Sequence, residues 1–76
     1  MEIERRVARL RALMAEKVLD GVLVTKEESG HYFSGFRGDS TALLITPERL
    51  LLMPDNRYTE QAQLQAPSYD VVEQHD

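Results

Sequence analysis

The stretch from Thr41 to Met53, TALLITPERLLLM, decides the fold class of this chain. Two apolar runs lie on either side of the tripeptide Pro47-Glu48-Arg49. Proline suits the second position of a tight turn because its ring already holds the backbone in the required conformation. Apolar runs joined by such a turn are typical of a β-hairpin. The pattern therefore predicts strands at 41–46 and 49–53 that pair antiparallel.

A helix and a strand are predicted on the N-terminal side of this hairpin. Apolar side chains recur at helical spacing between charged ones, at Ile3, Val7, Leu10, Leu13 and Met14. This amphipathic pattern predicts a helix over 2–17 with one buried stripe. The following apolar run, VLVT at 22–25, predicts a short strand buried on both faces.

We expect strain at the end of this first helix. The position after a helix often adopts a left-handed backbone, which favours Gly or Asn. Val18 stands there instead. Either Val18 avoids a positive φ, or glycine at this position stabilises the domain.

The segment 26–40 is polar and contains three glycines. We interpret it as a loop around one helical turn near 29–33. Its aromatic residues are expected to anchor it to the core: Tyr32, Phe33 and Phe36.

Beyond the hairpin, the chain predicts one more helix and one more strand. The carboxylate of Asp55 can cap a helix over about 56–65, and Pro67 stops that helix. The β-branched centre of YDVVE predicts a last strand at 69–74. The fold class is therefore α/β, with a mixed sheet of about four strands and covering helices. Two helices are few for such a sheet, so we expect 1–76 to be a domain incomplete at its C-terminal side.

Composition excludes several classes of protein. The formal net charge is −4, and acidic residues interleave with the basic ones of the first helix, so we expect no nucleic-acid partner. No run approaches the ~20 apolar residues of a membrane span, and no apolar leader begins the chain. There is no cysteine, which excludes disulfides and thiolate zinc sites. We expect a cytoplasmic protein.

The chain also lacks a recognisable catalytic or metal-binding pattern. The histidines, His31 and His75, are isolated, and no pair of ligands has metal-site spacing. No serine lies in a Gly-x-Ser-x-Gly elbow. The segment GFRGD at 35–39 lacks the lysine of a phosphate loop, which disfavours nucleotide binding. We predict no catalytic residue, no metal and no cofactor in this chain.

Three blocks follow one another along the sequence: RLRALMAEK at 9–17 with VLVT at 22–25, YFSGFRGDS at 32–40 with ALLIT at 42–46, and DNRYTEQA at 55–62. In this order they resemble the N-terminal domain of the creatinase/aminopeptidase P family. The chain departs from the family pattern at Val18, where a glycine is usual, and at Ser29-Gly30-His31, where Asn-Ile-Arg is frequent. It is also shorter than the family's N-terminal domain.

The resemblance implies a fold and a function. The fold is a partial ribonuclease H-like domain, with strand 22–25 beside 41–46 and strand 69–74 parallel to 22–25 on its other side. The function is that of a non-catalytic N-terminal module of an Xaa-Pro aminopeptidase or dipeptidase (prolidase), a metallopeptidase whose catalytic domain holds two divalent ions (Mn, Co or Zn). Such a module supplies subunit contacts and shapes the substrate cleft. We therefore expect self-association as a homodimer, or contact with a catalytic domain.

Four residues are candidates for the substrate cleft or the interface: Phe36, Arg37, Arg57 and Tyr58. The loop 35–38 places an aromatic residue and a cation between two glycines, which permit a close approach. In enzymes that the chain resembles, this loop can face a neighbouring subunit's cleft, where an arginine could hold a substrate carboxylate. The alternative function is a stand-alone binding or assembly module without a catalytic partner.

Overall fold

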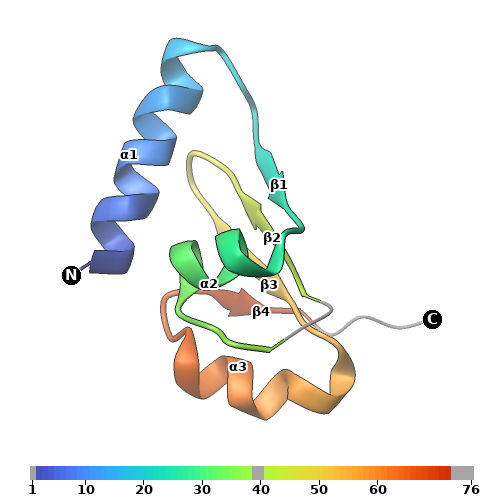
Figure 1. The fold of residues 1–76 in the computed structure, drawn as a ribbon. Coiled ribbons are helices and arrows are strands. Elements are labelled where there is room, and N and C mark those ends of the chain that lie inside the picture. Colours follow the sequence, from blue (N-terminus) through green and yellow to red (C-terminus); the bar gives the residue numbers. More distant parts are fainter. Residues whose placement is uncertain (1, 39–40, 73–76) are drawn as a thin grey trace.

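The computed structural model describes residues 2–38 and 41–72, apart from the side chain of Asn56. The elements in chain order are α1 (Glu2–Glu16), β1 (Val22–Val24), α2 (Glu27–Ser34), β2 (Ala42–Ile45), β3 (Leu50–Met53), the 3-10 turn η1 (Asn56–Tyr58), α3 (Thr59–Gln65) and β4 (Asp70–Val71). Figure 1 shows a mixed sheet with α1 and α2 beside it and α3 running across the ends of its strands. The predicted α/β class with a four-stranded mixed sheet is confirmed.

The hairpin forms as predicted. β2 and β3 are antiparallel, with Ala42 opposite Met53 and Ile45 opposite Leu50. The turn is closed twice, because the Arg49 N–H donates to Thr46 Oγ1 (2.8 Å) and the Thr46 N–H donates to the Arg49 carbonyl (3.0 Å). Arg11 of α1 then donates to the carbonyls of Thr46 (2.8 Å) and Arg49 (3.1 Å). The guanidinium thus ties the first helix to the hairpin turn.

The predicted place of the last strand is wrong. β4 pairs parallel with β3, on the outer edge of the hairpin, and the strand order is β1-β2-β3-β4. The Val72 N–H extends this pairing with a 2.8 Å bond to the Leu52 carbonyl. The connection through α3 makes a β-α-β unit, whose two parallel strands usually lie next to each other. For β4 to lie on the far side of β1, the connection from β3 would have to cross the whole sheet. Residues 73 and 74 of the predicted strand lie outside the described part of the chain.

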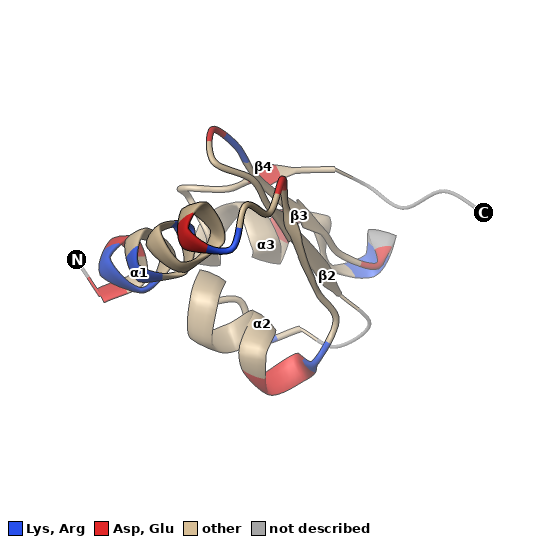
Figure 2. Ribbon diagram, turned by 90° about the horizontal axis from the view of Figure 1, so that it is seen from above, with Lys and Arg blue, Asp and Glu red and all other residues tan. Residues whose placement is uncertain are grey.

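The expectation that 22–25 is buried on both faces is also wrong. β1 is an edge strand of three residues, in which Val24 is buried while Leu23 is 61% exposed. Strand residues alternate between the two faces of a sheet. Figure 2 shows α1 and α2 on the same side of the sheet, so the side chains facing them are the covered ones.

The core lies between that covered face and the helices. Val24, Leu43, Leu52 and Val71 are neighbours in register across all four strands. Helices α1 and α3 and the loops that carry Phe36 and Tyr69 add further side chains to this row. The whole cluster of buried apolar residues is Val7, Met14, Val24, Phe36, Leu43, Ile45, Leu52, Ala62, Ala66 and Tyr69. Burying one aliphatic side chain contributes about 1.5–3 kcal/mol, so these few contacts supply much of the stability of so short a chain.

The segment predicted as a loop with one helical turn contains the longer helix α2. Gly30 in its middle is a poor helix former, which explains why the sequence pattern understated it. The helix ends at Gly35, whose φ of 81° lies in the left-handed region, and the Gly35 N–H donates to the His31 carbonyl (2.8 Å). Tyr32 is 46% exposed and lies against the Arg6 guanidinium (4.3 Å), so it is not the core anchor that we expected.

No helix within residues 2–38 and 41–72 has the length and apolar character needed to cross a membrane.

The predicted strain at the end of α1 is present. Val18 has a φ of 56°. Its N–H donates to the Ala15 carbonyl (3.3 Å), and the next N–H, from Leu19, donates to the Met14 carbonyl (2.8 Å). These are the two bonds of a Schellman motif, which normally has glycine at the Val18 position. The side chain is 86% exposed, so little packing offsets the strained backbone.

We predict that Val18→Gly raises the melting temperature. Removing the Cβ relieves a strain of about 1 kcal/mol, which corresponds to about 4–8 °C in a domain of this size. Ala15→Gly is the matched control, because Ala15 lies inside the helix and glycine there should lower stability. Thermal denaturation followed by circular dichroism measures both changes. A lower melting temperature for Val18→Gly would contradict the role given to the backbone strain.

Tyr69 joins α2 to the segment before β4. Its side chain is only 6% exposed, and its hydroxyl donates to the Phe33 carbonyl at 2.6 Å. Burial raises the pKa of Tyr69 to about 12, while the positive charge of Arg11 acts in the opposite direction. The folded state therefore favours the neutral phenol.

We predict that Tyr69→Phe costs about 1 kcal/mol, because the hydrogen bond to Phe33 is lost. The raised pKa adds a dependence on pH. Stabilisation by the neutral phenol is fully present below pH 10 and is lost as the pH rises towards about 12. The difference in melting temperature between the two proteins should therefore shrink as the pH rises above 10. Curves that stay parallel would show that Tyr69 does not titrate with folding.

Candidate functional site

The loop that follows α2 is held by a buried serine. The Ser34 hydroxyl donates to the Gly30 carbonyl (2.6 Å) and accepts from the Phe36 N–H (3.1 Å). Together with the left-handed backbone of Gly35, these bonds turn the chain back towards the sheet. The Phe36 ring enters the core and is 2% exposed. Phe36 is therefore first of all the anchor of this loop.

Gly38 lies directly against that anchor. A Cβ added to Gly38 would be 2.2 Å from the Phe36 Cζ atom, far inside van der Waals contact. The ring and the backbone of residue 38 can thus pack together only because residue 38 is glycine.

Arg37, between these two residues, is exposed and held at two points. Its backbone N–H donates to Gln65 Oε1 (3.0 Å) on α3. Its side-chain Nε donates to His31 Nε2 (3.2 Å) on α2. Among the described residues, the two terminal amino groups of Arg37 have no hydrogen-bond or ion-pair partner.

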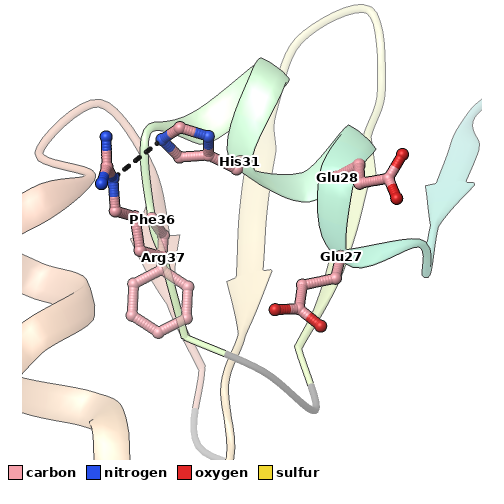
Figure 3. A pocket seen from close by; sticks show the side chains of 5 residues that line it. All are labelled: Glu27, Glu28, His31, Phe36 and Arg37. Carbon is pink, nitrogen blue, oxygen red and sulfur yellow. Dashed lines mark hydrogen bonds between the residues drawn. The ribbon is translucent and has the colours of Figure 1, made fainter.

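A cavity of about 490 Å³ opens beside this arginine. Figure 3 shows its lining residues, with Arg37 and His31 on one side and the two carboxylates on the other: Glu27, Glu28, His31, Phe36 and Arg37. A second cavity, of about 230 Å³, shares Glu27, His31 and Phe36 with the first. The site is thus a surface hollow with Arg37 and His31 on one side and the two carboxylates on the other.

Of the other two candidates, Tyr58 lies near this loop. The Tyr58 and Phe36 rings meet edge to face, with centroids 6.2 Å apart. Arg57 lies over the Tyr58 ring (5.2 Å) and pairs with Asp55 (Nε to Oδ1, 3.3 Å). The structure therefore joins Phe36 to Tyr58, but neither Tyr58 nor Arg57 lines the cavity beside Arg37.

Asp55 acts as the predicted helix cap, since its carboxylate accepts from the Arg57 N–H (3.1 Å) at the start of η1. This backbone hydrogen bond, followed by the bond from the Arg57 side chain, lowers the pKa of Asp55.

Sequence reasoning did not find four residues around Arg37: Glu27, Glu28, His31 and Gln65. Glu27 and His31 are four residues apart, so they share one face of a helix, but this signal needs α2 to be recognised first. Gln65 comes from a distant element and left no signal. Asp39, the acidic neighbour of Arg37 in sequence, lies outside the described residues.

The described residues, 2–38 and 41–72, contain no group of three or more His, Cys, Asp or Glu side chains that could hold a metal ion. His75 lies beyond them.

Comparison with known proteins gives a consistent family assignment. Residues 6–76 match the family model of the Creatinase/Prolidase N-terminal domain. The chain is 31% identical over 68 residues to the peptidase YqhT of Bacillus subtilis. The matched region is 90% of this chain but only 19% of YqhT.

Solved structures agree with this match. The Xaa-Pro dipeptidase from Bacillus anthracis superposes with a TM-score of 0.90 and 35% identity, over 97% of this chain and 21% of its own. The N-terminal domain of the cytoplasmic peptidase PepQ from Mycobacterium tuberculosis gives a TM-score of 0.88 and 37% identity, over 93% of this chain and 56% of its own.

We predict that Gly38→Ala lowers the melting temperature, because the new methyl group must displace the buried Phe36 ring. Overpacking of this kind typically costs about 1–3 kcal/mol. Gly30→Ala is the matched control, since a Cβ there meets no atom within 4 Å. Alanine in the middle of α2 should instead stabilise by about 0.5–1 kcal/mol. Equal effects of the two substitutions on the melting temperature would contradict the contact between Gly38 and Phe36.

Proposed function

Because the chain belongs to the Creatinase/Prolidase N-terminal domain family, we propose that it is the non-catalytic N-terminal module of a cytoplasmic Xaa-Pro peptidase. Its relatives by sequence and structure are peptidases, one of them an Xaa-Pro dipeptidase by name. The chain spans about a fifth of the length of these relatives, and in this proposal the activity belongs to a longer protein that carries the module. The absence of cysteine agrees with the reducing compartment that we propose.

The hydrolytic chemistry would lie outside this module. The two divalent ions expected of such a metallopeptidase (Mn, Co or Zn) do not fit the described residues, among which no set of ligands comes together. We therefore assign the metals to a catalytic domain and derive no step through them here.

The observation that carries the proposal is the way Arg37 is held. His31 Nε2 accepts a hydrogen bond from the Arg37 Nε, and Gln65 Oε1 accepts one from the Arg37 backbone N–H, so these bonds orient the guanidinium beside the cavity. Within residues 2–38 and 41–72, the two terminal amino groups have no partner. A guanidinium with both of these groups available can bind a carboxylate through two parallel hydrogen bonds. In this proposal, Arg37 holds a carboxylate of the peptide at the edge of the substrate cleft.

The remaining candidate residues suit a contact between subunits or domains. Arg57 and Tyr58 form an exposed cation and a half-buried ring beside Phe36. Leu23 exposes apolar surface on the face of the sheet opposite α1 and α2. These features support the proposed association with a second copy of the module or with the catalytic domain.

The test is Arg37→Ala in the peptidase that carries this module. We expect KM to rise about tenfold, because a hydrogen-bonded charge pair is worth about 1.5–3 kcal/mol, while the melting temperature hardly changes. Arg9→Ala, on the exposed side of α1, is the matched control and should leave KM unaltered. A lower melting temperature with unchanged kinetic constants would mean that Arg37 is structural and that the loop is only a connector.

A further inference from the structure

β1 lies along one edge of the sheet (Figure 1), and the hydrogen-bond pattern shows which of its backbone groups point away from the sheet. In the hairpin, the Thr46 N–H donates to the Arg49 carbonyl, so these two residues form a hydrogen-bonded pair. Bonded and non-bonded pairs alternate along antiparallel strands, so Leu44 also directs its N–H and carbonyl towards β3. Leu23 lies opposite Leu44. Its own N–H and carbonyl therefore point outwards from the edge.

The same alternation makes the backbone groups of Gly21 and Thr25 point outwards as well. The extended course of β1 reaches beyond its three residues, since Lys26 still has extended backbone angles (φ −73°, ψ 132°). Among the described residues, the outward groups of Gly21, Leu23 and Thr25 have no hydrogen-bond partner. The Leu23 side chain is 61% exposed. An edge with unpaired backbone groups and an exposed apolar side chain is a template for another strand.

The sequence of this edge is complementary to itself. Residues 20–26 read DGVLVTK, with an acidic residue before the apolar centre and a basic residue after it. Asp20 and Lys26 are exposed, and within residues 2–38 and 41–72 neither has an ion-pair partner. Two such strands that run antiparallel bring Asp20 of each copy opposite Lys26 of the other. Opposite charges that face each other across two strands stabilise the pair.

We propose that the β1 edge binds a second copy of this chain, as an antiparallel pair centred on Leu23 that joins two four-stranded sheets into one. The contact is two-fold symmetric, because each copy offers the same edge to the other. The inference rests on the association with a second copy in the proposed function, and it names the surface and the register. Such an interface is small, so we expect a dimer with a Kd on the order of 100 µM.

Backbone and charges select the same register. With Leu23 opposite the same residue of the second copy, the outward groups of Leu23 meet each other, and those of Gly21 meet those of Thr25. A shift by one residue would set outward groups against inward ones, and it would also turn the apolar side chains to the wrong face. A shift by two residues would separate Asp20 from Lys26. In the selected register, the two Leu23 side chains also cover each other on the face opposite α1 and α2.

The first experiment reverses the charges at the ends of β1. Sedimentation equilibrium of the 76-residue chain, up to about 1 mM, measures the Kd of the dimer. Asp20→Lys and Lys26→Asp each place like charges opposite one another at both ends, so each should raise the Kd about tenfold. The double variant Asp20→Lys/Lys26→Asp restores opposite charges and should return the Kd to that of the unchanged chain. The control is Glu60→Lys, at an exposed position on α3, which should leave the Kd unaltered.

The outcomes of this experiment are decisive because the two single substitutions shift the net charge in opposite directions. A general effect of charge therefore cannot weaken the dimer in both. A double variant that dimerises as poorly as the single ones overturns the proposed register. A chain that stays monomeric at about 1 mM overturns the proposal and leaves this edge for a strand of another protein.

The second experiment locates the contact. The chain has no cysteine, so Leu23→Cys introduces a single thiol at the two-fold axis. The Cα atoms of a hydrogen-bonded antiparallel pair are about 5.5 Å apart, which lies within the range that a disulfide spans. Under mild oxidation, Leu23→Cys should form a covalent dimer about tenfold faster than Leu64→Cys, whose thiol lies at a 78% exposed position on α3. Equal rates of cross-linking contradict the proposal.

These results separate the inference from the proposed function. If Arg37→Ala raises KM in the peptidase while the chain is monomeric, or while its dimer ignores the substitutions in β1, only the inference fails. If the β1 variants behave as expected while KM is insensitive to Arg37, the role in the substrate cleft fails and the contact between the two edges stands.

Discussion

Leu43 and Leu52 face each other across the hairpin, both fully buried, and the rest of the structure depends on keeping this pair away from water. Val24 and Val71 extend the same row to the edge strands. Burial of each aliphatic side chain contributes about 1.5–3 kcal/mol, whereas a domain of this kind is stable by only about 5–15 kcal/mol. A helix that failed to cover this row would therefore remove much of the stability of the chain.

The covering helices are fastened to the sheet by polar groups as well as by packing. Arg11 binds the two carbonyls of the hairpin turn, and the Tyr69 hydroxyl binds the carbonyl of Phe33 near the end of α2. These bonds satisfy backbone acceptors that lie between elements, and they set where α1 and α2 stand relative to the strands. The position of α2 in turn places Glu27 and His31 beside the loop that carries Arg37. The candidate site is thus a consequence of how the core is covered.

Several elements could be predicted because their signals are local. The hairpin follows from two apolar runs with a proline between them, and the first helix from the spacing of Val7 and Met14. The strained end at Val18 follows from the kind of residue found after a helix. In contrast, α2 was understated because Gly30 lowers its helical propensity, and Leu23 was expected to be buried because a run of apolar residues does not reveal which strand lies at an edge.

The sequence by itself determined the α/β class, the hairpin, the resemblance to a family and the choice of Phe36 and Arg37 as residues of interest, because each rests on patterns within a few neighbouring residues. Only the tertiary structure decided that β4 lies beside β3, since strand neighbours depend on the path of the connection through α3. It alone decided that Arg37 bonds to His31 and lines a cavity together with Glu27. Charge and hydrogen bonding act over a few ångströms of space, and residues from different elements come within that distance only when the chain is folded.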